Sequence, residues 1–162
     1  MTSVVDENVL IVANDLTRRS QGLAPLCPEA DDDCGIACAD ALYDLIENGR
    51  VGLDDGSEIL EKYKQHCSFS GQPGVGDAFM RAVFERGYDD SWAERVSVRA
   101  NGNFKLPESF LSCGFDNDDH LWIAVAHNAS VTASVLNAVD SDYQIHAEEL
   151  GKLDLTIVQL CA

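Results

Sequence analysis

Three aspartates end short apolar segments of the kind that form buried β-strands. Asp6, Asp54 and Asp140 end the segments SVVD, VGLD and VLNAVD. The carboxyl ends of parallel strands lie at one edge of a sheet, where ligands bind, so these side chains can meet although they are far apart in the sequence. Asp119 opens the segment just before the strand that carries Asp140, and we expect it at the same edge. Taken singly, each aspartate is equally typical of a turn or a helix cap.

A cluster of carboxylates has a definite chemical consequence. Carboxylates within about 4 to 6 Å of one another repel, which raises their pKa values and destabilises the fold unless a cation neutralises them. Oxygen ligands suit Mg²⁺ and Mn²⁺, which commonly complete their coordination shell with a substrate phosphate. The sequence therefore predicts a Mg²⁺ or Mn²⁺ site that acts on a phosphate-containing substrate.

The elements that must position these residues follow from the apolar pattern. Short apolar runs alternate with longer amphipathic segments, which predicts an α/β fold with a mainly parallel sheet. We expect strands at residues 3–6, 50–54, 96–100, 134–139 and 154–160. Helices fill the intervals, most clearly at 34–49, 56–66, 74–87 and 118–128, with Ser57 as a cap, while 17–33 reads as an exposed loop.

Length and charge restrict the class of protein. A chain of 162 residues has the size of one domain, so we expect residues 1–162 to fold as a single unit. Neither a secretory signal nor an apolar stretch of about 20 residues is visible, which predicts a cytoplasmic protein without a membrane segment. The formal charge of −17 weighs against broad adhesion to nucleic acid, so any contact with RNA must be local or metal-mediated.

The cysteines show no compact disulfide framework, and we expect reduced thiols. Cys34 and Cys38 would share one helical face. We favour two small buried side chains there over a zinc site completed by His66 or Cys67. The six cysteines are Cys27, Cys34, Cys38, Cys67, Cys113 and Cys161.

The segments VVDENVL, FDNDDHLWIAVA and LNAVDSDY, in this order, resemble the PIN domain family of metal-dependent ribonucleases. LDDGSEILEKY and PGVGDAF in the middle of the chain are similar to a less-studied branch of that family. The resemblance covers essentially the whole chain, and its specificity lies in the order and spacing of short motifs. The matching residues are Asp6 with Asn8, Asp119 with Ala124 and Ala126, and Asp140 with Asp142 and Tyr143.

The resemblance implies a three-layer α/β/α fold and hydrolysis of RNA phosphodiester bonds with Mg²⁺ or Mn²⁺. Asp6, Asp119 and Asp140 would hold the metal, and Asp142 would hold water or a second ion. Asn8 would fix the turn after the first strand or orient Asp6. Family members are often dimers, which makes a homodimer an implication of the resemblance.

One position departs from the family pattern. A glutamate is expected beside the tyrosine of LEKY, and Lys62 stands there. Glu58 lies one helical turn before Lys62, and Glu61, or Asp40 on the preceding helix, is a further candidate for the missing carboxylate. Asp77 of PGVGDAF is interpreted as a helix cap.

Other readings stay open. Lys62 and the negative charge favour a degenerate PIN-like protein that binds a protein partner or serves as a scaffold. A phosphatase-like hydrolase ranks last, because Asn8 follows Asp6 and no phosphate-binding glycine loop is present. For Arg18 and Arg19 a solvated charge pair is favoured over a grip on phosphates, and Trp122 is expected in the core.

Overall fold

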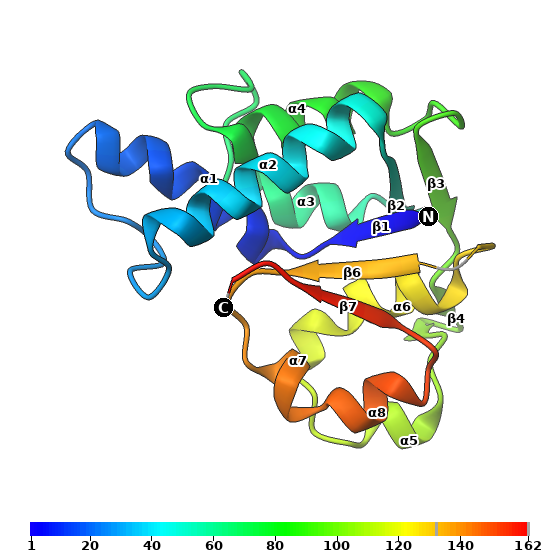
Figure 1. Cartoon of the computed structure of the whole chain (residues 1–162). Helices are drawn as coiled ribbons and strands as arrows, with labels where there is room; N and C mark the ends of the chain where they lie inside the picture. Colours follow the sequence, from blue (N-terminus) through cyan, green and yellow to red (C-terminus); the bar gives the residue numbers. More distant parts are fainter. Residues whose placement is uncertain (132, 162) are drawn as a thin grey trace.

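A five-stranded parallel β-sheet forms the centre of the computed structural model, which describes residues 1–131 and 133–161 (Figure 1). The strand order is β3-β2-β1-β6-β7, and every neighbouring pair is parallel. The strands are β1 (Thr2–Val5), β2 (Arg50–Asp54), β3 (Ala93–Val96), β6 (Ala133–Asn137) and β7 (Thr156–Gln159), and a separate antiparallel hairpin consists of β4 (Arg99–Ala100) and β5 (Asn103–Phe104).

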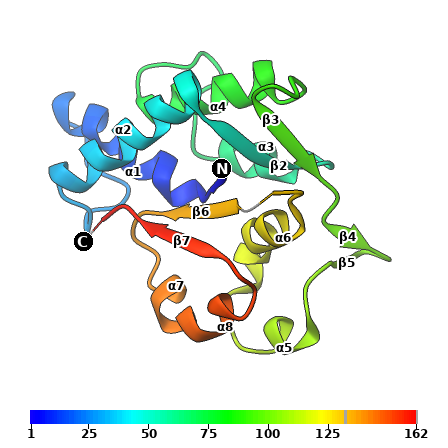
Figure 2. The same cartoon turned by 45° about the vertical axis from the view of Figure 1, so that its right-hand side comes forward.

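Helices cover both faces of this sheet, as Figures 1 and 2 show. One face carries α1 (Glu7–Ser20), α2 (Asp32–Asn48), α3 (Glu58–Lys64) and α4 (Val75–Arg86). The other carries α5 (Glu108–Leu111), the 3₁₀ turn η1 (Asn117–Asp119), α6 (His120–Asn128), α7 (Asp142–Ile145) and α8 (Ala147–Gly151). The predicted three-layer α/β/α architecture with a parallel sheet is therefore confirmed.

The core explains why these segments form these elements. All five residues of β6 are buried, as expected of a strand covered on both faces. Trp122 of α6 is fully buried and stacks on Tyr63 of α3, which confirms its predicted core position. No helix in the described part of the chain is long and apolar enough to cross a membrane.

Two predicted boundaries and one predicted helix cap are wrong. The third strand runs over Ala93–Val96 instead of 96–100, because Arg99 and Ala100 pair with the hairpin strand β5. The expected loop at 17–33 begins only after Ser20, since the amphipathic pattern of α1 continues to that residue. Ser57 makes no side-chain cap, and the carboxylate of Asp54 accepts from the first backbone amides of α3 instead.

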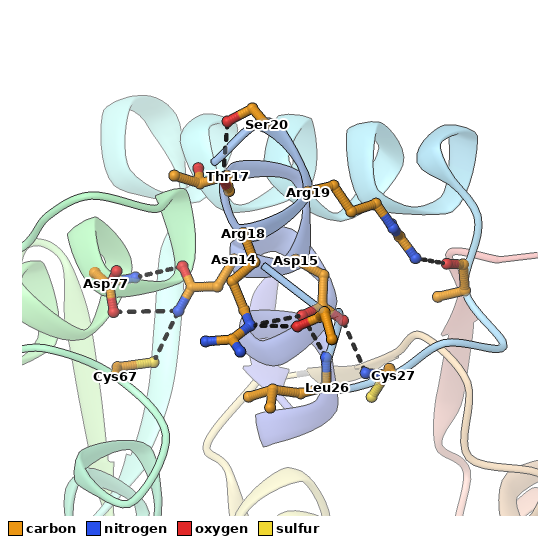
Figure 3. A network of polar contacts seen from close by, with 12 residues as sticks. Asn14, Asp15, Thr17, Arg18, Arg19, Ser20, Leu26, Cys27, Cys67 and Asp77 are labelled. Carbon is orange, nitrogen blue, oxygen red and sulfur yellow. Dashed lines mark hydrogen bonds and ion pairs between the residues drawn. The ribbon is translucent and has the colours of Figure 1, made fainter. Parts of the chain in front are cut away.

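The connection between α1 and α2 is held by polar side chains of α1 (Figure 3). The buried carboxylate of Asp15 accepts hydrogen bonds of 2.8 Å each from the backbone amides of Leu26 and Cys27. Arg18 donates to the carbonyl of Ala24, and Arg19 pairs with Asp32. Both arginines therefore contact the chain itself, neither forming the solvated pair that we expected nor pointing to a phosphate site.

Candidate metal centre

Three carboxylates meet at the carboxyl edge of the sheet. Asp6 follows β1, Asp140 follows β6, and Asp119 ends η1 immediately before α6. Each contributes an oxygen, and these oxygens lie within 4.8 Å of one another. The structure thus brings together the three aspartates of the motif order, whereas Asp54, the third strand-end aspartate that we expected to meet Asp6 and Asp140, does not belong to the cluster.

Asp6 is the most deeply buried of the three, with 2 % of its surface exposed. One oxygen accepts from the backbone amide of Asn8 at 3.1 Å, which caps α1, and the other accepts from the Tyr143 hydroxyl at 2.7 Å. Burial raises the pKa of Asp6 to about 7, although both hydrogen bonds favour the carboxylate and lower it. The side chain is therefore fixed in place and poorly stabilised as an anion.

Asp119 has an even higher affinity for a proton. Its partial burial, the charge of Asp6 and a hydrogen bond with Asp140 together raise its pKa to about 8. The indole nitrogen of Trp122 donates to Asp119 at 3.3 Å and orients the carboxyl. Near neutral pH the cluster must retain a proton or bind a cation, because three adjacent carboxylates repel one another.

Two asparagines join the ends of β1 and β6 beneath the carboxylates. The Asn8 side chain donates to the Asn137 side chain at 2.9 Å and accepts from the amide of Ala138 at 2.8 Å. Asn137 in turn donates to the carbonyl of Asp140 at 2.9 Å and to the Gln159 side chain at 2.8 Å. The Asn8 side chain therefore ties the start of α1 to the end of β6, while its backbone amide holds the Asp6 carboxylate.

Sequence reasoning missed Asn137 and Gln159. Asn137 is fully buried, and a buried amide must find hydrogen-bond partners. The one asparagine inside the apolar segment VLNAV was the signal that could have revealed it. Gln159 carries no comparable signal, since its partners come from β6.

Asp142 supports the centre from its rim. Its backbone amide donates to Asp140 at 2.9 Å, and its carboxylate accepts from the amide of Asp116 at 3.2 Å. The Asp142 carboxylate does not belong to the cluster of three oxygens that lie within 4.8 Å of one another. The contact of Asp142 with water or a second ion therefore stays a prediction.

The structure does not bring a fourth carboxylate from α2 or α3 into the cluster. Glu58 forms a bidentate ion pair with Arg99, which lowers the pKa of Glu58. Glu61 is exposed and pairs with Lys64 at 2.7 Å, and Asp40 is exposed on α2. Among the residues 1–131 and 133–161, the acidic metal-ligand cluster consists of Asp6, Asp119 and Asp140.

Lys62 instead contacts the segment that carries Asp119. Its ammonium group donates to the carbonyl of Asp118 at 2.9 Å and lies 5.7 Å from the ring centre of Trp122. The lysine thus lies beside the centre, where the family pattern has a glutamate. Its positive charge is expected to weaken the attraction of the centre for a metal ion.

Asp54 and Asp77 have structural roles. Asp54 is fully buried and uses both oxygens on the amides of Glu58 and Ile59, at 2.8 Å each. Asp77 accepts from the amides of Gly74 and Ser68, at 2.9 and 2.7 Å, so it caps its helix as predicted. A carboxylate whose oxygens already satisfy backbone donors is a cap rather than a candidate metal ligand.

The expectation that all cysteines are reduced is wrong for two of them. Cys34 and Cys161 form a disulfide across a sequence separation of 127 residues, with a Cα–Cα distance of 4.9 Å. The segment after β7 returns to the first turn of α2, a contact that sequence spacing does not reveal. His66 and Cys67 lie elsewhere, His66 beside Glu7 and Cys67 beside Asn14, so they do not complete a zinc site with Cys34 and Cys38.

No protein-family model, curated protein or solved structure matches this chain. The three aspartates offer only hard oxygen ligands, which fit Mg²⁺ or Mn²⁺ better than a soft metal.

Proposed function

We propose that this protein is a Mg²⁺- or Mn²⁺-dependent endoribonuclease of PIN type, which hydrolyses RNA phosphodiester bonds. The observation that carries the proposal is the meeting of Asp6, Asp119 and Asp140, with oxygens within 4.8 Å of one another. Two of these groups, Asp6 and Asp119, have raised pKa values, chiefly because burial disfavours their charged forms and in addition because neighbouring acidic groups repel them. Perturbed carboxyls gathered at the ligand-binding edge of a parallel sheet support a functional site.

The residues have distinct tasks in this proposal. Asp6, Asp119 and Asp140 hold the ion, which when bound supplies Lewis acidity toward the phosphate and lowers the pKa of water. Tyr143 holds the Asp6 carboxylate in one orientation through its 2.7 Å hydrogen bond. Asn8 and Asn137 tie β1 to β6 and so keep Asp6 and Asp140 at a constant separation.

Contact with RNA is local in this proposal because the formal charge is −17. Lys62, which touches the segment that carries Asp119, is placed to meet a phosphate at the rim.

The alternative is a degenerate PIN-like protein that binds a protein partner. Lys62 occupies the expected glutamate position, and Glu58 and Glu61 are engaged with Arg99 and Lys64. These contacts favour a weakened centre. The alternative predicts a folded protein that does not bind metal at millimolar concentration.

Calorimetric titration of Mn²⁺ into metal-free protein tests the proposal. We expect saturable binding in the wild type and loss of binding in Asp140→Asn and Asp119→Asn. Asp40→Asn, at an exposed position of α2, is the matched control and should bind Mn²⁺ like the wild type. Cleavage of single-stranded and structured RNA is then measured with the same variants. Binding without cleavage would leave a metal site of another function, and absence of binding at millimolar Mn²⁺ would favour the degenerate alternative.

A further inference from the structure

A second cluster of metal-ligating side chains lies beside the N-terminal turn of α2. The sulfur atoms of Cys34, Cys38 and Cys161 lie within 4.8 Å of one another. Cys34 and Cys161 form the disulfide, and Cys38, which is fully buried, is a free thiol directly beside it. Three sulfur atoms from two segments that are far apart in the sequence therefore lie close together.

The spacing and distances suit a soft divalent metal. Cys34 and Cys38 are separated by three residues, within the spacing common to zinc-binding cysteine pairs. Zinc binds thiolate sulfur at about 2.3 Å, which places the sulfur atoms of a tetrahedral site roughly 3.8 Å apart. The three sulfur atoms lie within 4.8 Å of one another, so reduction of the disulfide needs to separate Cys34 and Cys161 only slightly to reach that spacing.

Cys27 lies on the loop that leads into the same region. Asp15 holds its backbone amide at 2.8 Å (Figure 3), so the loop is fixed at this residue. Cys27 does not belong to the group of three sulfur atoms that lie within 4.8 Å of one another, so the cluster itself supplies three ligands. A water molecule can complete the coordination of a zinc ion that is held by three protein ligands.

A pocket connects this cluster with solvent and with the carboxylate centre. Its volume is about 550 Å³, and Cys34, Cys161 and Asp140 are among its lining residues. Glu29, Asp31 and Asp33 line it too and would attract a cation. A reductant and a metal ion can therefore reach the sulfur atoms of Cys34 and Cys161.

We propose that the reduced protein binds one Zn²⁺ at Cys34, Cys38 and Cys161, with water as the fourth ligand, and that the Cys34–Cys161 disulfide is the oxidised, metal-free form of this site. This site is independent of the carboxylate centre and takes a soft metal where that centre takes a hard one. The sulfur atoms of Cys34 and Cys161 can therefore either form the disulfide or bind zinc, but they cannot do both at once.

The chemistry balances with simple reagents. A trialkylphosphine and one water reduce the disulfide: phosphorus becomes the phosphine oxide, and both protons of the water end on the sulfurs of Cys34 and Cys161. Zn²⁺ then displaces the thiol protons to the buffer. An added low-molecular-weight disulfide reverses the process, since it takes two electrons from the two thiolates, leaves as two thiols or thiolates, and releases the metal.

Cobalt titration after phosphine reduction tests this proposal. We expect one equivalent of Co²⁺ to produce the absorption bands of a tetrahedral cobalt thiolate, and Zn²⁺ to remove them by competition. Cys38→Ser should weaken binding at least tenfold, whereas Cys113→Ser should not change it. Unchanged binding in Cys38→Ser, or absence of thiolate bands in the reduced wild type, would overturn the site.

A measurement on the wild-type chain avoids variants that fail to fold. Reduced protein is alkylated with and without Zn²⁺, and the modified cysteines are identified by mass spectrometry. We expect Zn²⁺ to protect Cys34, Cys38 and Cys161 while the modification of Cys67 and Cys113 stays the same. Equal modification of all six cysteines with and without Zn²⁺ would overturn the proposal.

Discussion

The hydroxyl of Tyr143 donates a 2.7 Å hydrogen bond to the Asp6 carboxylate across 137 residues of sequence. This bond stabilises the charged form of a carboxyl that burial otherwise drives toward protonation. Tyr143 thereby links α7 to the end of β1 and orients a proposed metal ligand without touching the metal itself.

Replacing Tyr143 by phenylalanine is expected to weaken Mn²⁺ binding about tenfold, as the loss of an outer-shell partner typically does. The pKa of Asp6 should rise above about 7, because one of the two hydrogen bonds that lower it is gone. Calorimetric titration measures the affinity. Tyr88→Phe, on an exposed tyrosine, serves as the control. Equal Mn²⁺ affinities of the two variants would contradict the positioning role.

The stability of the metal-free protein should fall as pH rises from about 4 to about 8. Asp6 and Asp119 have pKa values of about 7 and about 8 in the folded state, against an ordinary value of 3.8, so the folded protein retains protons that the unfolded chain has released. The free energy of unfolding then decreases with pH over this range, because the folded state binds more protons than the unfolded state. Urea unfolding at several pH values measures it.

Two further unfolding measurements test whether Asp6 and Asp119 cause this pH dependence. Saturating Mn²⁺ should remove the decrease, because the ion favours the carboxylate forms, and Asp119→Asn should reduce it in the metal-free protein. A slope that is the same in Asp119→Asn and in wild type would show that other acidic groups are responsible.

Lys62→Glu is expected to tighten Mn²⁺ binding about tenfold, or about 1.4 kcal/mol. The change removes a positive charge that contacts the segment of Asp119 and supplies the carboxylate of the family pattern. Lys64→Glu is the matched control, since Lys64 is two residues away and pairs with exposed Glu61. An unchanged affinity in Lys62→Glu would place this position outside the metal centre.

Asp54→Ala should destabilise the protein by about 2 kcal/mol and leave Mn²⁺ affinity unchanged. The substitution leaves the amides of Glu58 and Ile59 without the acceptor that caps α3. Urea unfolding and calorimetry separate the two effects. A loss of metal affinity in folded Asp54→Ala would show that this strand-end aspartate also belongs to the centre.

The sequence by itself determined the fold class and the order of the motifs. Alternating apolar runs and amphipathic segments encode the strands and helices locally, and parallel strands necessarily deliver the residues that follow them to one edge. The convergence of Asp6, Asp119 and Asp140 was therefore predictable. The short hairpin that shifts the third strand was not, because two-residue strands have no periodicity.

Only the tertiary structure decided which carboxylates remain available to bind a metal ion. Asp6 and Asp54 both follow a strand and cap a helix, but Asp54 uses both oxygens on backbone amides, whereas Asp6 turns one oxygen toward Tyr143 and the cluster. The return of Cys161 to α2 was equally hidden. Local sequence patterns determine the helix or strand in which a residue lies. The partners of Asp6 and Cys161 come from segments more than a hundred residues away, so they depend on how the layers pack.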